Sequence, residues 1–418
     1  MNLSAKKKSW NEIDLITEYA KYNRISNSDG FFNSVVDLQQ SLDIQIHEYK
    51  PGTSYNYWKI PKRWHVKRAV LKDMEGDIIA SFDKNPLYLW AYSYPFQGII
   101  SKEELIEHHI FSNPDLPEYL PFRFRQMFKH WETNWGFSLP HKIVEEMKET
   151  HYHVDIDTYF TDDPMITFEY TSPGKSEECI IMVGHWCHHN IVEDGLSGCS
   201  VGLKVIDELK KIDHYYTYKF IGVPEVIGAV AYLSEFGEIA TKLKACLGLN
   251  FLGRNDYFVL FQSINNRSQL DTALEQSLKS LGFNFCVLPF KHADESKFFP
   301  NDIDNSLYGR GSGDEAPFES PGFNIPTSSL IRRIPYKEYH TDQDKPSLIN
   351  QNNLFNARKI ILEAFNIIEN NWTPEGTFQG LPCLSSPDLN LWLSAPRDSN
   401  MPQKQDIDIP SEALREYK

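Results

Sequence analysis

The chain has 418 residues, of which 41% are hydrophobic and 24% charged, a globular composition with room for two domains. Its formal net charge of -15 repels phosphate backbones and anionic lipid headgroups, so we expect neither a nucleic-acid nor a membrane partner. The six cysteines lie far apart without a C-x-x-C pair, which predicts reduced thiols. Together with the absence of a signal-peptide pattern, this predicts a cytoplasmic protein.

The chain contains three successive regions with different sequence patterns. Residues 9–48 hold two apolar-periodic stretches, which predict two helices. Short aromatic or alternating runs divided by Pro and Gly follow, and they predict a small β-rich domain inserted at 51–165. Residues 1–50 and 166–375 are predicted to form an α/β domain, because from 166 apolar strand-like runs alternate with helix-length segments. That alternation predicts a mostly parallel, doubly wound sheet. Residues 376–418 are predicted to be a partly disordered C-terminal extension.

Candidate metal ligands gather after the apolar run CIIMV, in the segment GHWCHHNIVEDGLSG. It contains His185, His188 and Asp194 within ten residues. Neutral imidazole and carboxylate are common zinc ligands, and a strand end followed by a glycine-containing helix start can direct several of them to one point. An ordinary surface turn would explain this segment alone equally well.

Two further candidates follow later apolar runs. Glu225 follows YKFIGV at a strand end, where burial or a nearby metal could suit it to proton transfer, although a helix start also favours a carboxylate. His340 follows SSLIRRIP, and its acidic neighbours could orient its ring. Between them Asp314 and Glu315 stand beside glycines that allow close approach to a ligand, although exposed acidic turns have the same pattern.

Taken in this order, the segments resemble those of the zinc aminopeptidase and glutaminyl cyclase superfamily. The closest likeness is to an uncharacterised aminopeptidase-like branch with an inserted β-domain, often encoded near polysaccharide or natural-product biosynthesis genes. The resemblance covers nearly the whole chain and rests on NRISNSDG, WKIPKRWHVKRAVLKDMEGDIIASF, GHWCHHNIVEDGLSG, VPEVIGAVAYLS, DEAPFESPGFNIPTSSLIR and EYHTDQD.

The resemblance implies roles for individual residues. His185 takes the place of the metal-binding histidine at the strand end, Asp194 that of the carboxylate that binds or bridges metal, and His340 that of the last ligand. His188 belongs to a Cys-His segment typical of the branch and is an alternative ligand to His185. Glu225 takes the place of the catalytic glutamate.

Two departures from the family pattern bear on the number of metal ions. The better-known aminopeptidases have two adjacent glutamates where this chain has Glu225 and Val226, and an aspartate where it has the segment containing Asn250 and Leu252. The missing carboxylates favour one zinc ion per chain with an open position for water.

The resemblance implies hydrolysis of an amide bond next to a free amine in a small molecule or short peptide. Glu225 would move the proton, and Asp314 and Glu315 would attract the substrate's ammonium group. The alternatives are an amidohydrolase or deacylase acting on a biosynthetic intermediate, a cyclase of N-terminal glutamine, and a non-catalytic relative that binds an amine or peptide. A homo-oligomer is compatible with the sequence.

Overall fold

The computed structural model describes residues 10–123, 129–288, 313–372 and 380–390. The chain divides into two compact units, Met1–Glu369 and Asn370–Lys418. Apart from residues 380–390, the predicted C-terminal extension at 376–418 lies outside the described residues, so its predicted disorder stays a prediction.

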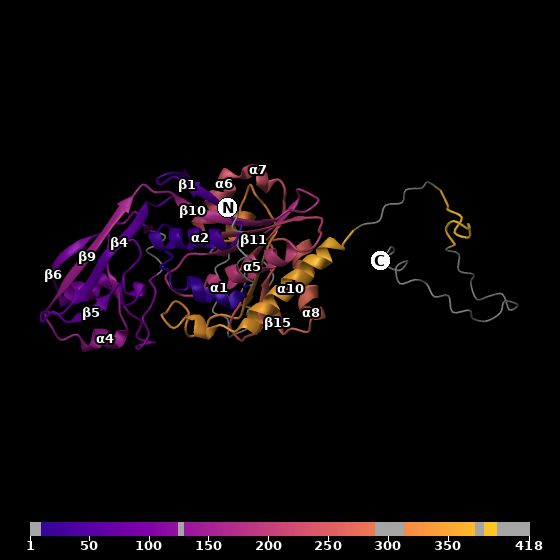
Figure 1. Cartoon of the computed structure of the whole chain (residues 1–418). Coiled ribbons are helices and arrows are strands. Elements are labelled where there is room, and N and C mark those ends of the chain that lie inside the picture. Colours follow the sequence, from indigo (N-terminus) through magenta and orange to yellow (C-terminus); the bar gives the residue numbers. More distant parts are fainter. Residues whose placement is uncertain (1–9, 124–128, 289–312, 373–379, 391–418) are drawn as a thin grey trace, which may run out of the picture. The chain divides into compact units, whose positions relative to one another are not determined.

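The first unit is organised around an eight-stranded sheet (Figure 1). Its order is β1-β10-β12-β11-β13-β16-β14-β15. The four central strands β12, β11, β13 and β16 are mutually parallel, whereas β10 and β14 join them antiparallel on either side. This confirms the predicted α/β class with a mostly parallel sheet. The strands are β1 (Gln45–Tyr49), β10 (Met165–Ser172), β11 (Cys179–His185), β12 (Thr217–Val223), β13 (Leu243–Leu249), β14 (Phe258–Phe261), β15 (Phe285–Leu288) and β16 (Thr327–Arg332).

Both faces of the sheet are covered, as the apolar strand runs predict. All seven residues of β11 are buried, and its side chains alternate between two cores. Ile180 and Met182 belong to the core under α1, α5, α8 and α10, whereas Ile181 and Val183 pack with residues of α6 and α9. These helices are α1 (Glu12–Tyr19), α5 (Leu196–Leu209), α6 (Ile227–Glu235), α8 (Gln269–Ser280), α9 (Ala316–Glu319) and α10 (Gln351–Glu369).

The two helices predicted near the start of the chain are α1 and α2 (Asp29–Ser41). Ser28 begins α2 by accepting a hydrogen bond from the backbone amide of Phe31, as a good N-cap residue does. A short helix α7 (Gly237–Ala240) follows α6. Within the described part of the chain, no helix combines the length and the apolar character that crossing a bilayer requires.

The predicted β-rich region contains a four-stranded antiparallel sheet of order β5-β4-β9-β6, grouped together in Figure 1. Its exact domain boundaries stay a prediction. The region's elements are β2 (Ser54–Tyr55), β3 (Trp58–Lys59), β4 (Arg63–Lys72), β5 (Ile78–Ser81), β6 (Phe96–Ser101), α3 (Lys102–Glu104), β7 (Ile110–Phe111), β8 (Phe137–Ser138), α4 (His141–Glu146) and β9 (His151–Thr161).

A buried ion pair inside the large sheet gives a test of the fold. Glu169 on β10 accepts hydrogen bonds from Lys219 Nζ and from the Tyr232 hydroxyl, each at 2.6 Å. Burial alone would raise the pKa of Glu169, but His47, Lys219 and Tyr232 together outweigh burial and lower it. A carboxylate whose pKa is lower in the folded than in the unfolded state stabilises the fold above its unfolded pKa.

We expect Glu169→Gln to lower the free energy of unfolding at pH 7 by about 3 kcal/mol, because the charge of Lys219 then loses its partner. The difference from the unaltered protein should shrink as the pH falls below about 4, where Glu169 of the unfolded chain is protonated. Urea unfolding at pH 7 and at lower pH measures both. Glu177→Gln is the control, since its partner Lys242 lies in an exposed pair, and it should leave the midpoint unchanged. Equal effects of the two variants would contradict the assignment.

Candidate metal centre

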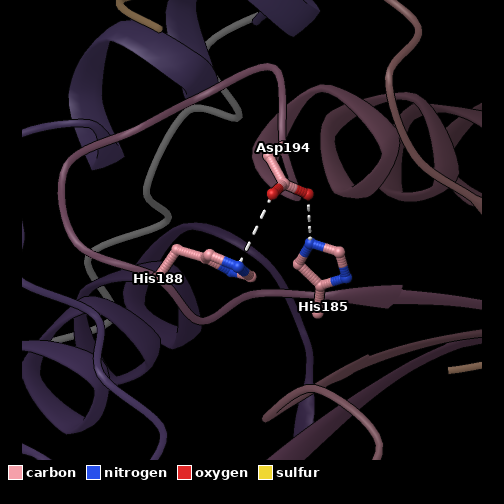
Figure 2. Close-up of side chains that lie close together, drawn as sticks. All are labelled: His185, His188 and Asp194. Atoms are coloured by element: carbon pink, nitrogen blue, oxygen red, sulfur yellow. Dashed lines mark hydrogen bonds and ion pairs between the residues drawn. The ribbon is translucent and has the colours of Figure 1, made fainter. Parts of the chain in front are cut away.

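Three histidine rings surround the carboxylate of Asp194. His185 Nε2 lies 2.9 Å from Oδ1, and His340 Nε2 lies 2.9 Å from Oδ2. His188 Nε2 lies 3.6 Å from Oδ2. Figure 2 shows His185 and His188 next to each other, each directed at a different oxygen of this carboxylate. The structure thus brings together the four residues that the sequence proposed as ligands.

The sheet places these side chains at one edge. His185 is the last residue of β11, and Glu225 follows the end of the neighbouring parallel strand β12 by two residues. Asn250 comes directly after β13, the parallel neighbour on the other side. Because the carboxyl ends of parallel strands open on the same edge, residues far apart in sequence converge there.

Asp344 fixes the loop that carries Asp194. Its carboxylate accepts hydrogen bonds from the backbone amides of Val192, Glu193 and Asp194 at 3.3, 2.7 and 3.2 Å. It also accepts the Tyr336 hydroxyl at 2.8 Å. Three consecutive amides that share one carboxylate are held in one orientation, so the direction of the Asp194 side chain is set by its backbone.

Arg24 fixes the loop that carries His188. This guanidinium is fully buried and donates to the backbone carbonyls of Trp186 (2.8 Å) and Ile191 (2.9 Å) on either side of His188. The backbones of Arg24 and His188 also pair in an isolated β-bridge. The NRISNSDG segment, which contains Arg24, therefore holds the loop around His188 in place.

Several site residues have backbone angles that side chains normally avoid. The φ angles of His188, Val226 and His340 are 91°, 58° and 53°. Such positions are uncommon for residues other than glycine and cost free energy that the surrounding structure must offset. Their concentration next to Asp194 and Glu225 makes this edge of the sheet a candidate functional site.

The electrostatics follow from burial and mutual contact. Burial opposes the charged form of Asp194, but the three imidazoles hold the pKa of this carboxyl well below its usual range. Burial would lower the pKa of His185, but hydrogen bonds to Asp194 and Asp314 raise it well above its usual value. Burial lowers the pKa of His188 far below the usual range, so this ring is neutral. A neutral imidazole beside a charged carboxylate is the form in which both bind metal ions.

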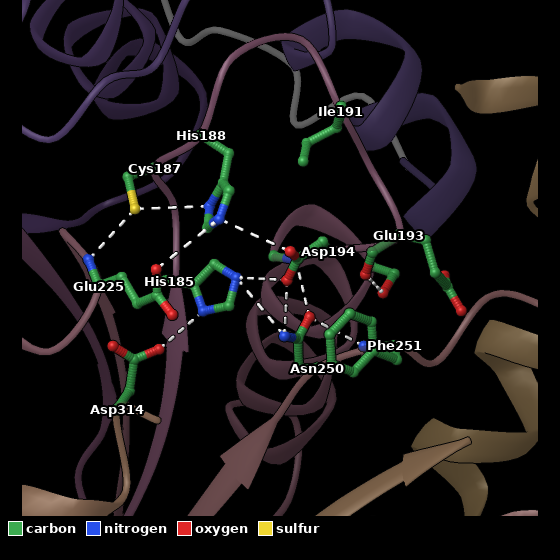
Figure 3. Close-up of polar contacts among 12 residues, drawn as sticks. His185, Cys187, His188, Ile191, Glu193, Asp194, Glu225, Asn250, Phe251 and Asp314 are labelled. Atoms are coloured by element: carbon green, nitrogen blue, oxygen red, sulfur yellow. Dashed lines mark hydrogen bonds and ion pairs between the residues drawn. The ribbon is translucent and has the colours of Figure 1, made fainter. Parts of the chain in front are cut away.

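Glu225 lies beside this cluster, with Oε2 at 3.7 Å from His188 Nε2. Its backbone amide donates to Cys187 Sγ at 3.2 Å (Figure 3). Burial raises the pKa of Glu225 to about 8, and the nearby carboxylates of Asp194 and Asp314 add to the effect. A carboxyl group with this pKa can both take up and release a proton near neutral pH.

Asp314 and Glu315 are adjacent in sequence but have different surroundings in the site. Asp314 Oδ2 lies 2.9 Å from His185 Nδ1, and Oδ1 accepts the backbone amide of Val226 at 2.8 Å, so Asp314 orients the ring of His185 (Figure 3). Burial raises the pKa of Glu315 to about 7. Substrate binding by either residue stays a prediction.

A cavity of about 370 Å³ adjoins the site. Its polar wall includes His185, Asp194, Glu225, Asp314, Glu315 and Glu319, and its apolar wall includes Phe251, Phe261, Ile264, Ile331, Ile334 and Tyr339. A mostly apolar cavity with a few convergent polar groups is typical of small-molecule sites.

Asn250 lies beside the carboxylate of Asp194. Its side-chain amide donates to Asp194 Oδ1 at 2.9 Å, and its Oδ1 accepts the amide of Gly195 at 2.7 Å. An amide in this position fills a hydrogen-bonding role, because its nitrogen donates to the carboxylate that it faces.

The β-rich region contributes directly to the site. Phe122 is buried, and its ring packs edge-on against His188 and His340 with centroids 5.2 Å apart in both pairs. Its backbone amide donates to the carbonyl of His340 at 2.7 Å, and Asp342 donates its amide to Leu120 at 3.0 Å. Phe122 and Asp344 were not among the predicted site residues. Asp344 lies in the EYHTDQD segment, which could have indicated it, whereas nothing local distinguishes Phe122 from other core aromatics.

The donor set fits a metal ion. His185, His188 and Asp194 each offer one ligand atom, and all of these atoms lie within 4.8 Å of one another. His340 adds a third imidazole. A second group with the same spacing is formed by Cys187, His188 and Glu225. Imidazole nitrogens and a carboxylate oxygen are zinc-type donors, and the ring of His185 has the carboxylate partner that metal-binding histidines usually have.

A family model described as "Domain of unknown function (DUF4910)" matches residues 13–371. The chain belongs to this family. It is also 27% identical over 361 residues to a Clostridium acetobutylicum protein named for polysaccharide biosynthesis and an aminopeptidase-like domain, an alignment that covers 86% of this chain and 78% of that one.

Solved structures of other proteins superpose on this chain. A crystal structure described as a peptidase from Clostridium acetobutylicum superposes with a TM-score of 0.76 at 27% identity, covering 86% of this chain and 80% of that one. A zinc aminopeptidase from Bacillus subtilis superposes with a TM-score of 0.56 at 14% identity, covering 86% and 94%. The second likeness shows the fold alone. Together they confirm the resemblance to zinc aminopeptidase-like proteins.

The position of His185 depends on a residue without a side chain. Gly195 has a φ of 101°, and a Cβ atom there would lie 2.6 Å from the carbonyl oxygen and 2.7 Å from the ring Cδ2 of His185. Gly76 has a similar φ of 96° with no atom within 4 Å of such a Cβ. The two glycines therefore share the backbone strain of a substitution but differ in the contact with His185.

We expect Gly76→Ala to lower the free energy of unfolding by about 1 kcal/mol through backbone strain alone. Gly195→Ala should cost about 3 kcal/mol, because His185 or the loop must also move. Chemical denaturation of the two variants measures the difference. Equal losses would show that the space beside His185 is not tightly filled.

Proposed function

We propose that the chain is a metal-dependent hydrolase that cleaves an amide bond next to a free amine. The convergence of three imidazoles on Asp194, with Glu225 beside His188 at the carboxyl edge of the sheet, carries the proposal. The aminopeptidase-like fold shared with the Clostridium acetobutylicum and Bacillus subtilis proteins supports this reaction class.

His185, His188, Asp194 and His340 would hold one zinc ion, which would polarise the amide carbonyl and activate a water molecule. Glu225 takes the proton from the attacking water on its carboxylate and passes it to the leaving amine as the carbon–nitrogen bond breaks. Asp314 keeps the ring of His185 oriented through Nδ1.

The cavity of about 370 Å³ would receive the part of the substrate that carries the amine. Asp314, Glu315 and Glu319 give its polar wall several carboxylates, which suit an ammonium group. Its apolar wall, which includes Phe251 and Ile331, would accept an apolar substituent next to that group.

A second candidate is hydrolysis of an amide in a biosynthetic intermediate, such as an N-acylated amino sugar. The name of the Clostridium acetobutylicum relative, which refers to polysaccharide biosynthesis, favours this candidate. The same residues would serve both reactions, so the choice between them depends on substrate tests.

We expect elemental analysis of protein purified without a metal-binding tag to give about one zinc per chain. His340→Ala should lose most of this zinc, because the variant lacks one imidazole of the site. His153→Ala is the matched control, since His153 is exposed on β9, and it should keep the metal. Absence of metal from all three proteins, even after added zinc, would overturn the hydrolase proposal.

Glu225→Gln should keep its zinc but lower turnover by about 10²-fold or more, because the amide side chain cannot carry the proton. A panel of aminoacyl p-nitroanilides, N-acetylglucosamine with acetate detection, and N-terminal glutamine peptides with ammonia detection separates the peptidase, deacylase and cyclase alternatives. Glu238→Gln, at an exposed residue of α7, is the control. Turnover that survives in Glu225→Gln would remove Glu225 from the mechanism, and no turnover by the zinc-loaded protein on any substrate would favour a binding protein.

A further inference from the structure

A second cavity, of about 270 Å³, also reaches Glu225. It is lined by Ser26, Asn56, Tyr57, Trp58, Lys59 and His130, by Trp131 and by Glu225 itself. Because Glu225 lines both cavities, a substrate whose amide bond lies at this carboxylate can extend into each of them. The carboxylate-rich cavity of about 370 Å³ and this aromatic cavity, which is built mostly by the β-rich region, have Glu225 in common.

The aromatic side chains of this cavity remain in water. Tyr57 is fully exposed, Trp131 is 59% exposed and Trp58 is 36% exposed. Large aromatic rings contribute most to stability when buried, so three of them left exposed around one cavity form a surface suited to a ligand. They come from two segments more than 70 residues apart.

The backbone under these rings is held in place. Tyr57 lies in the tight turn of the β2–β3 hairpin with a φ of 70°, which is an unusual angle for a bulky residue. The hydroxyl of Tyr55 in the same hairpin donates to Glu235 at the end of α6. His130 Nε2 donates to the carbonyl of Lys59 at 2.8 Å, which ties the Trp131 segment to the hairpin. The rings are therefore presented from a defined framework.

We propose that the aromatic cavity is a subsite for a pyranose ring of the substrate, on the far side of the amide bond from the ammonium group. This proposal rests on the proposed function and names the class of molecule that the site accepts. A pyranose ring has a flat face of C–H groups, which stacks on indole and phenol rings, and a rim of hydroxyl groups. Asn56, Lys59 and Ser26 place donors and acceptors next to the aromatic faces, which suits such a rim.

A purely apolar side chain would not use these polar groups. A Phe or Leu side chain of a peptide would pack on the aromatic rings but would leave Lys59 and Asn56 without substrate partners. Apolar contacts alone also discriminate poorly between similar apolar side chains. A sugar ring uses both kinds of lining at once. The mixture of aromatic faces and hydrogen-bonding groups therefore favours a carbohydrate.

Saturation-transfer NMR on the zinc-loaded full chain tests the proposal. The probes are methyl glycosides of glucose, N-acetylglucosamine and glucuronic acid, with Gly-Phe as the peptide comparison. We expect at least one glycoside to give signals at its ring C–H protons, and Trp58→Ala and Trp131→Ala to reduce them at least 5-fold. Tyr215→Ala is the matched control: Tyr215 is 51% exposed and precedes the opposite end of β12, so the signals should persist.

Circular dichroism and urea midpoints show whether each variant is folded, and Tyr57→Ala replaces Trp58→Ala if that variant is not, since Tyr57 is fully exposed. Absence of signals from every glycoside, or signals unchanged in the folded variants, overturns the subsite. Signals from Gly-Phe alone that depend on Trp58 also overturn it in favour of a peptide. Binding needs no turnover, so a failed hydrolase assay with intact glycoside signals overturns the proposed function and leaves the subsite standing.

Discussion

A carboxylate that is 3% exposed is the feature around which this site is built. Burying a charge is costly unless partners surround it, and Asp194 has His185, His188 and His340 as those partners. These contacts form only if the carboxylate and the three imidazole rings are held in fixed orientations. The surrounding structure meets this requirement by holding each loop through its backbone, as Asp344 does for the loop of Asp194.

This fixed geometry requires strained backbone conformations, because His188, Val226 and His340 adopt φ angles in the left-handed region. A fold can keep such angles only where neighbouring contacts outweigh the strain. The buried guanidinium of Arg24 supplies such contacts beside His188, and the pairing with the β-rich region supplies them at His340. The strained angles and the contacts that offset them therefore lie together, beside the candidate metal ligands.

The sheet and its two helical faces could be predicted from the sequence, because buried parallel strands such as β11 have continuous apolar runs that few other structures produce. The convergence of His185 and Glu225 followed from the position of each residue at or just after a strand end. Asp194 lies nine residues after His185, in the loop that follows β11. The tertiary partners could not be predicted in this way. Phe122 looks like any core aromatic, and the contact of Asp314 with His185 joins residues 129 positions apart.

The pairing of residues 120–122 with residues 340–342 has a consequence for how this architecture can change. The β-rich region that contains residues 120–122 is of a kind that a fold can normally shorten or exchange freely. Here its removal would expose the backbone groups of the last histidine's loop and strip the aromatic cover from two imidazoles. The β-rich region and the candidate metal centre are therefore constrained to change together, and the α/β part of the chain alone would lack the aromatic cover of two of its candidate ligands.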